Sequence, residues 1–124
     1  NGCFDIVHRG HIELLEYCQS IGDKVIVGLN SDNSIKRLKG EKRPINCQKD
    51  RKYLLDSLKF VDEVIIFDED TPLELIKKLL PDVIVKGGDY TVESVVGNNL
   101  CEVRIFKYVK GYSTTAAIQD INNR

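Results

Sequence analysis

Two histidines, the only ones in the chain, lie three residues apart at the start of a predicted helix. His8 and His11 would share one side of that helix, because residues three apart are neighbours on a helical surface. Gly10 lies between them and lets a ligand approach the backbone. The N-terminus of a helix also presents unpaired N–H groups and a partial positive charge, both of which favour phosphate. This element therefore predicts phosphate chemistry, with both imidazoles as hydrogen-bond donors to phosphate oxygens.

Two other interpretations of the histidine pair remain open but are less favoured. The histidines could be incidental surface residues, although the chain concentrates all its histidine at the best anion site. Asp5 could join them around a metal ion, but two histidines without a convincing third ligand make a poor zinc site. No protein-only metal site is predicted.

Further candidate residues lie on either side of a predicted nucleotide pocket. Gly2, Cys3 and Phe4 precede the histidines, between an expected strand end and the helix, and they are predicted to line the pocket. Asp89 follows two glycines after a buried strand, where a nucleotide can lie against the backbone. We expect Asp89 to accept hydrogen bonds from the ribose or base, although a plain turn after the strand is an equal alternative.

A second phosphate-binding run is predicted near the end of the chain, at the start of a last short helix over 113–121. Hydroxyl and backbone N–H groups at a helix start can hold a phosphate, and ordinary capping by Ser113 is compatible with that role. The predicted binding residues of this run are Gly111, Ser113, Thr114 and Thr115.

Basic residues gather between 31 and 46, the longest polar stretch, which is predicted to be a ligand-binding loop. Lys39 is expected to neutralise phosphate charge, with help from Lys36. Arg51 is expected to contact the triphosphate or the acceptor phosphate. Three other basic residues are assigned to a solvated face: Arg37, Lys42 and Arg43.

The composition is that of one soluble globular domain. The chain has 124 residues, of which 42% are hydrophobic and 30% charged, with a formal net charge of −1. This charge gives nucleic-acid binding no electrostatic support. No apolar run approaches the roughly 20 residues that span a membrane, and no leader is visible. The four cysteines form no C-x-x-C pair, which favours reduced thiols in the cytoplasm.

Alternating patterns predict the elements that position these residues. Short β-branched apolar runs indicate buried strands over 24–30, 63–67, 82–86 and 102–106. Helical spacing indicates helices over 11–21, 48–59 and 71–80, the last with Thr71 as N-cap and Glu74 completing a capping box. The expected fold class is α/β, a Rossmann-like open parallel sheet with helices on both faces. We expect a single domain over 1–124 that lacks the start of its first strand, because the chain opens where that strand should be ending.

The motifs resemble those of a known superfamily. The run from Gly2 to His11 is similar to the HxGH nucleotide-binding motif of the cytidylyltransferase-like superfamily, and Gly-x-Ser-Thr-Thr at 111–115 resembles its second motif. The resemblance implies a nucleotidyltransferase in which an acceptor phosphate attacks the α-phosphorus of a nucleoside triphosphate. It assigns His8, His11 and Lys39 to catalysis and implies Mg²⁺ as the companion of the triphosphate.

Several segments are closer to one branch, the D-glycero-β-D-manno-heptose 1-phosphate adenylyltransferases. They are 1–5, 30–32, 36–40, 43–46, 69–72 and 85–90. This branch implies transfer of AMP from ATP to heptose 1-phosphate, with release of pyrophosphate, for bacterial lipopolysaccharide. It also implies Asp5, Lys36 and Arg51 as substrate-binding residues, a homodimer, and fusion to or cooperation with a sugar kinase.

Two alternatives remain open. Glycerol-3-phosphate cytidylyltransferase would use CTP, but its relatives carry an arginine just before the Ser-Thr motif, where this chain has Tyr-Val-Lys at 108–110. Lys107 or Lys110 could replace that charge. The domain could also be a regulatory module that binds ATP or CTP without transferring anything.

Overall fold

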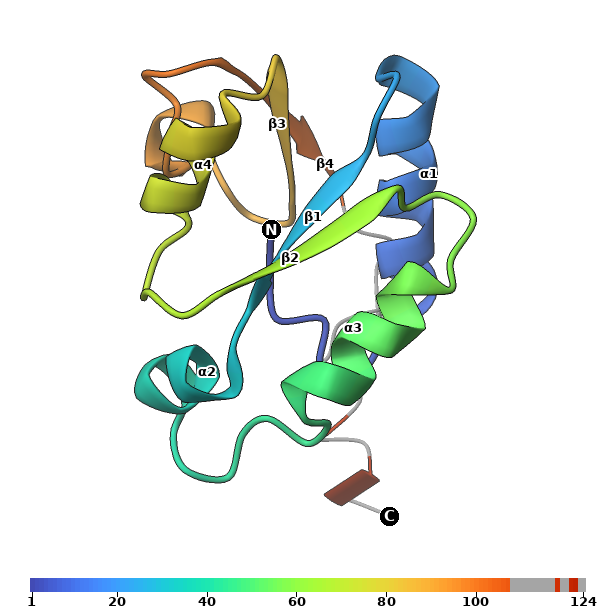
Figure 1. Ribbon diagram of the computed structural model, residues 1–124, viewed down its shortest axis with the longest axis vertical. Coiled ribbons are helices and arrows are strands. Elements are labelled where there is room, and N and C mark those ends of the chain that lie inside the picture. Colours follow the sequence, from blue (N-terminus) through green and yellow to red (C-terminus); the bar gives the residue numbers. More distant parts are fainter. Residues whose placement is uncertain (108–117, 119–120, 123–124) are drawn as a thin grey trace.

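The computed structural model describes residues 1–107, 118 and 121–122, in which helices and strands alternate as predicted (Figure 1). In order, they are α1 (Arg9–Ile21), β1 (Ile26–Asn30), α2 (Asp32–Lys39), α3 (Gln48–Asp56), β2 (Glu63–Phe67), α4 (Leu73–Leu79), β3 (Val83–Gly87), the 3₁₀ turn η1 (Val92–Ser94) and β4 (Glu102–Phe106). Each predicted strand is present within two residues of its expected bounds. None of the helices described has the length and apolar character to cross a membrane.

Strand pairing among the described residues is parallel throughout. β1 pairs with β2, with Ile26 opposite Glu63, and β3 pairs with β4, with Val83 opposite Glu102. Parallel neighbours cannot be joined by a tight hairpin, and helices occupy the long connections between them. The predicted α/β class is confirmed.

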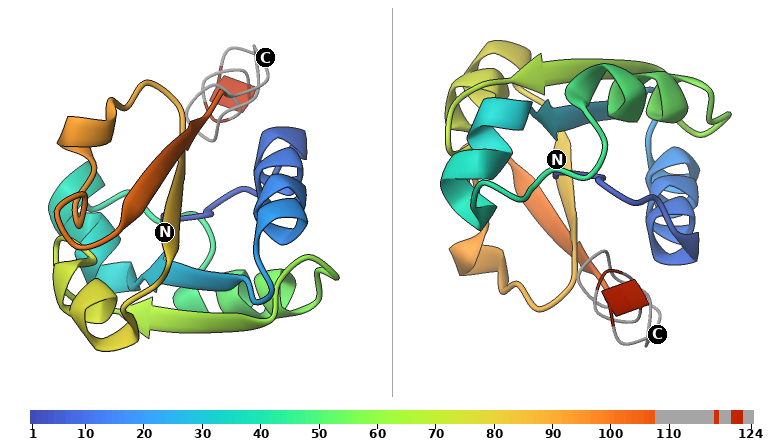
Figure 2. Two further views of the ribbon diagram at one scale, coloured as in Figure 1. Left: turned by 90° about the horizontal axis from the view of Figure 1, so that it is seen from above. Right: turned by 90° about the horizontal axis from the view of Figure 1, so that it is seen from below.

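The described strands form two separate pairs, whereas one continuous open sheet was predicted. The first two residues lie between the pairs (Figure 2). Gly2 forms a single parallel bridge to Leu29 of β1. On the other side, Lys86 Nζ of β3 donates to the carbonyl oxygen of Asn1 at 2.9 Å. So short a segment makes one bridge only, too few for a ladder that would connect the pairs.

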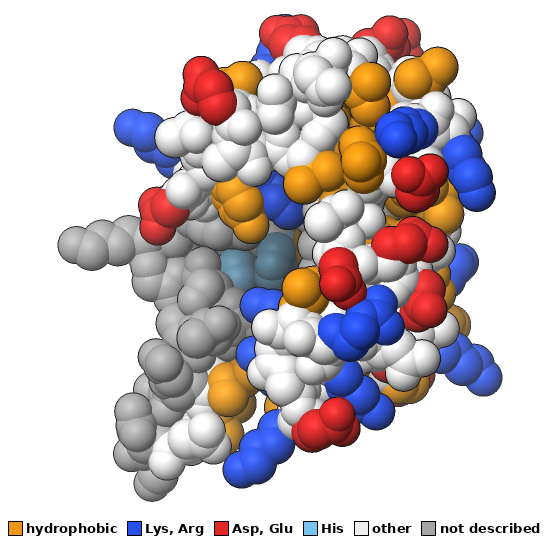
Figure 3. Space-filling view, turned by 90° about the vertical axis from the view of Figure 1, so that its left-hand side faces the viewer, with side chains coloured by type: hydrophobic (Ala, Val, Ile, Leu, Met, Phe, Trp, Pro, Cys, Tyr) orange, Lys and Arg blue, Asp and Glu red, His pale blue; other side chains and the backbone are white. Residues whose placement is uncertain are grey.

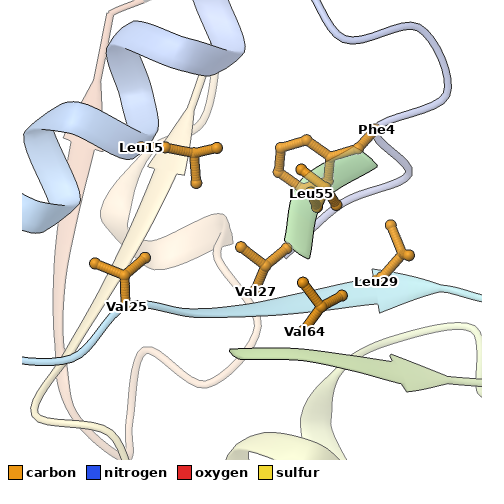
Figure 4. Close-up of a cluster of buried hydrophobic side chains, with 7 residues drawn as sticks. All are labelled: Phe4, Leu15, Val25, Val27, Leu29, Leu55 and Val64. Carbon is orange, nitrogen blue, oxygen red and sulfur yellow. The ribbon is translucent and has the colours of Figure 1, made fainter. Parts of the chain in front are cut away.

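Helices cover both faces of the strands, as predicted (Figure 2). One face of β1 packs against α1 and α3, and the cluster there contains Phe4, Leu15, Val25, Val27, Leu29, Leu55 and Val64 (Figure 4). Its members on and just before β1 alternate along the chain, because successive strand residues point to opposite faces. Gly28 therefore faces the other way, where a Cβ would lie 3.1 Å from Leu75 Cδ2 of α4.

Gly97 lies against a second apolar cluster, where α4 packs on β3 and β4. Its φ is +92°, and a Cβ would lie 2.9 Å from Ile84 Cδ1 and 3.0 Å from Ile76 Cδ1. We expect Gly97→Ala to lower the free energy of unfolding by about 2–3 kcal/mol, from backbone strain and overpacking together. Gly40→Ala is the matched control, because φ is +101° there and nothing lies within 4 Å. Its expected cost is about 1 kcal/mol. Equal losses in urea unfolding would show that packing plays no part.

Part of the predicted basic loop is helical. The stretch 31–46 was expected to be irregular, but α2 occupies its first half. Ser31 is the N-cap, and its Oγ accepts from the Ser34 N–H at 3.1 Å. Ile35 is fully buried and ties the helix to the core. A helix of eight residues contains few apolar positions, so the periodicity of the sequence did not reveal it. The irregular loop that remains spans 40–47.

The boundaries of the three other helices also differ from prediction. Helix α1 begins at Arg9, two residues before its predicted start. Pro72, not Thr71, is the N-cap of α4, and no side chain caps the helix. Pro72 has a ψ of 12°, outside the regular helical range, so the first turn starts one residue later and the predicted capping box with Glu74 does not form. Helix α3 ends at Asp56, three residues before its predicted end at 59.

Candidate active site

A pocket of about 400 Å³ opens where the chain start, the N-terminus of α1, the end of α2 and the 40–47 loop meet β3. Such a volume is typical of small-ligand sites. Figure 3 shows the histidines recessed in a hollow, with lysine and arginine side chains close by. Six of the predicted site residues line it: Gly2, Cys3, Phe4, His8, His11 and Lys39.

The two histidines cap α1 reciprocally. His8 is the N-cap, and its Nδ1 accepts from the Gly10 N–H at 3.0 Å. His11 Nδ1 accepts from the His8 N–H at 3.2 Å. The rings stack with their centroids 3.9 Å apart. Because each Nδ1 is an acceptor, the proton of each neutral ring lies on Nε2, which makes both Nε2–H groups hydrogen-bond donors.

Burial favours the uncharged form of both imidazoles. It lowers the pKa of His11 to about 4, with a smaller contribution from His8. It also lowers the pKa of His8. The pair is therefore not a source of positive charge at neutral pH, and the positive charge of the pocket comes from other residues. Lys39, Arg43 and Lys86 line the same pocket and supply it.

The pKa of His11 makes the stability of the protein depend on pH. Below pH 6.5 the unfolded chain binds a proton at this residue that the folded chain refuses until about pH 4. The free energy of unfolding should therefore fall as the pH drops from 6.5 to 4, by about 3 kcal/mol from His11 alone. Urea unfolding at several pH values measures this, with His11→Gln as the comparison. An equally steep fall in that variant would remove His11 as the cause.

Phe4 packs against His11. Its φ is +47°, rare for a residue with a Cβ, and its side chain is 7% exposed. The ring centroids of Phe4 and His11 lie 4.9 Å apart. A Cβ at Gly2 would lie 3.3 Å from Phe4 Cε2, so a larger residue there would crowd the ring. Strained conformations of this kind persist where the surrounding packing holds them.

Asp5 does not face the pocket, in contrast to its predicted role in substrate binding. Its side chain is completely buried. Oδ2 accepts from Arg43 Nε at 3.0 Å and from the Ile45 N–H at 2.8 Å, and Oδ1 accepts from the Asn46 N–H at 2.8 Å. Because protein donors occupy both oxygens, Asp5 holds the 40–47 loop in place.

Arg51 was also predicted to bind substrate, but it is 1% exposed and does not line the pocket. Nη1 donates to the carbonyl oxygens of Cys3 and Asn30 at 2.8 and 2.7 Å. Nε donates to Asn46 O at 2.9 Å, and Nη2 pairs with Asp32 Oδ1 at 2.8 Å. The guanidinium fastens the segment before α1, the end of β1 and the loop to one another, which leaves it no access to a phosphate.

Other predicted residues lie away from the pocket or outside the described part. Lys36 and Asp89 are exposed and are not among the residues that line it. Gly10 is buried, and its N–H already serves His8 Nδ1. The predicted second phosphate run, with Gly111, Ser113, Thr114 and Thr115, lies outside the described residues.

Sequence reasoning missed two cations of the pocket, Lys86 and Arg43. Lys86 ends an otherwise apolar strand just before two glycines, a signal that could have marked it. Its Nζ lies 5.1 Å from the ring centroid of Tyr90, and burial lowers its pKa. Arg43 was expected on a solvated face. It lies in the pocket instead, and its ion pair with Asp5 joins residues 38 positions apart. Sequence spacing cannot reveal such a contact.

Parallel strands, a helix that begins at the site, and paired imidazoles in a pocket lined by three cations define an α/β fold with a site chemically suited to phosphate groups. The cytidylyltransferase-like family model matches residues 1–120, and the chain belongs to this family. It is therefore a member of a nucleotidyltransferase family.

Two curated relatives are similar to this chain over nearly its whole length. The bifunctional protein HldE of a Nitratiruptor species is 58% identical over 120 residues, which is 96% of this chain and 26% of that protein. The bifunctional protein HldE of Helicobacter pylori strain J99 is 55% identical over 122 residues, 98% of this chain and 26% of that protein. The chain thus spans about a quarter of the length of these relatives.

A solved structure has the same fold. The lipopolysaccharide core biosynthesis protein from Thermoplasma volcanium GSS1 matches with a TM-score of 0.70 and 31% sequence identity. The match covers 90% of this chain and 93% of that chain, so the two domains correspond almost from end to end.

Proposed function

We propose that this domain transfers AMP from ATP to D-glycero-D-manno-heptose 1-phosphate and releases pyrophosphate. The observation that carries the proposal is the pair of neutral imidazole donors, His8 and His11, at the start of α1 in a pocket lined by three cations. An oxygen of the acceptor phosphate attacks the α-phosphorus in line, and the bond from that phosphorus to the oxygen bridging to the β-phosphate breaks. The bridging oxygen leaves with pyrophosphate. The proton count need not change, because the attacking oxygen is already ionised at neutral pH.

The residues act by positioning and by charge. Nε2–H of His8 and His11 would donate to oxygens of the triphosphate, where charge grows in the transition state. Lys39 and Lys86 would neutralise the triphosphate and the departing pyrophosphate. Neutral donors beside cations suit this task, since no histidine must lose or gain a proton during the reaction.

Mg²⁺ would enter with the nucleotide. Among the described residues, no group of three histidine, cysteine or acidic side chains could hold a metal ion. Mg²⁺ commonly keeps several waters and binds through substrate phosphates, so it can enter as part of the nucleotide without a set of protein ligands. When bound, the ion supplies charge neutralisation to the phosphates.

The identity of the acceptor is proposed from the similarity of this chain to other proteins. The segments 43–46 and 85–90 resemble heptose 1-phosphate adenylyltransferases, and the solved relative is a lipopolysaccharide core biosynthesis protein. The curated relatives are bifunctional and about four times as long as this chain, which fits our proposal of a partner sugar kinase domain. We further propose that the enzyme is a cytoplasmic homodimer, which light scattering of the purified protein can test.

Pyrophosphate release tests the proposed reaction. ATP and CTP are each supplied with heptose 1-phosphate and with glycerol 3-phosphate, under the same Mg²⁺ concentration. We expect release with ATP and heptose 1-phosphate at a kcat/KM at least tenfold above the other three combinations. Faster release with CTP and glycerol 3-phosphate would make the domain a cytidylyltransferase. ATP binding without release for any acceptor would make it a binding module.

A further inference from the structure

Arg43 is a pocket cation whose guanidinium is only partly used. Its side chain is 15% exposed and lines the pocket together with His8 and His11. Nε donates to Asp5 Oδ2 at 3.0 Å. Nη2 is buried and has no hydrogen-bond partner within the described part of the chain. Buried donors left without a partner are rare in folded proteins, and each calls for an explanation.

The guanidinium is held rigidly on one side. Asp5 is itself fixed, because it accepts from the backbone N–H groups of Ile45 and Asn46 at 2.8 Å each. Asn46 Nδ2 returns a hydrogen bond to the carbonyl oxygen of Asp5 at 2.6 Å. Arg51 then ties Asn46 to the segment before α1. The loop that carries Arg43 is thereby fastened to the segment that leads into the histidine pair.

Neighbouring basic residues lack this arrangement. Lys42 is exposed and does not line the pocket. Arg37 pairs with Asp70 at 2.7 Å on the surface. An arginine already held at Nε and beside other cations is suited to one class of ligand, since the planar guanidinium matches phosphate oxygens better than an ammonium group does.

We propose that Arg43 binds substrate by donating Nη2–H to a phosphate oxygen, and that Asp5 is the positioning residue that aims it. The assignment rests on the proposed nucleotidyl transfer. The phosphate belongs either to the triphosphate or to the acceptor, and the two sources are separated by experiment.

The test compares Arg43→Gln and Arg43→Lys with the exposed neighbour Lys42→Gln in the full chain. KM and kcat are measured separately for ATP and for heptose 1-phosphate. Arg43→Gln should raise one of the two KM values by roughly 10- to 100-fold, the range for losing a hydrogen bond to a charged group. Arg43→Lys should reverse only part of this rise in KM. Both KM values of Lys42→Gln should stay within threefold of those of the parent. A rise in the KM of ATP places the phosphate on the nucleotide, and a rise in that of heptose 1-phosphate places it on the acceptor.

Asp5→Asn tests the positioning role. It should raise the KM of the same substrate as Arg43→Gln does, and the double variant should show little further rise because Asp5 acts through Arg43. Changes under threefold in both KM values for Arg43→Gln would overturn the proposal, whether or not Asp5→Asn folds.

The proposed reaction and the role of Arg43 can fail separately. If no acceptor supports pyrophosphate release, calorimetric titration of the same Arg43 and Lys42 variants with ATP and with inorganic phosphate still decides on Arg43. Tenfold weaker binding of either probe by Arg43→Gln alone would uphold the role. Unchanged binding of both would overturn it.

Discussion

Replacing His11 with alanine is expected to lower kcat by about 10²-fold or more, with little change in the KM for ATP. Transition-state donors of this kind commonly contribute that much to catalysis. The ring has one nitrogen engaged with the His8 N–H at 3.2 Å, so its Nε2–H is the group that can reach a phosphate. Steady-state pyrophosphate release with ATP and the acceptor in excess measures the loss.

His11→Gln is the control for that experiment. Glutamine can place an amide N–H near the position of Nε2, so it should recover part of the activity while removing the ring. Because His11 is 8% exposed and part of the cap of α1, circular dichroism must show that each variant is folded. A folded alanine variant with kcat within a few-fold of the parent would remove His11 from the transition state.

The largest effect on stability is expected at Arg51. Arg51→Met keeps most of the side-chain volume but leaves the carbonyl oxygens of Cys3, Asn30 and Asn46 and the carboxylate of Asp32 without their donor. Removing one partner of a buried ion pair commonly costs about 3–5 kcal/mol. A loss of this size is a large part of the stability of a domain of this length. Urea unfolding measures the loss in the free energy of unfolding. A variant that fails to fold would also meet the expectation.

Lys52→Met is the matched control, because it lies one residue further along α3. Lys52 pairs with Asp56 at 2.7 Å on the surface, where both side chains are more than 40% exposed. Exposed pairs contribute at most about 1 kcal/mol, so this variant should unfold close to the parent. Similar losses for both variants would mean that Arg51 does not link the three segments as its contacts indicate.

Strands were predicted far better than the polar segments between them. The runs 63–67 and 102–106 match β2 and β4 residue for residue, because an apolar β-branched run has few alternatives to burial as a strand. Helix α2 was missed, since its hydrophobic signal rests on so few residues. The start of α4 moved by one residue, since Pro72 did not take up a helical conformation. The local pattern of apolar residues predicts buried segments well and the ends of helices poorly.

The candidate site was predicted where the signal was local. His8, His11 and the preceding turn lie within ten residues of one another, and the structure brings them into one pocket. Arg43 was expected on a solvated face but lines the pocket, and Arg51 was expected at the substrate but is buried. Both have partners that are distant in sequence. Arg51 reaches Cys3 across 48 positions, and no spacing rule predicts such a contact.

The sequence by itself determined the α/β class, the four parallel strands and the location of the histidine pair at a helix start. These follow from periodicity and from backbone geometry, which act over a few residues at a time. Only the tertiary structure decided the direction in which the pKa values of the imidazoles shift and which cations line the pocket. Burial lowers the pKa of His11, and a buried Asp5 turns Arg43 inward, and both effects depend on packing between segments that the sequence keeps far apart.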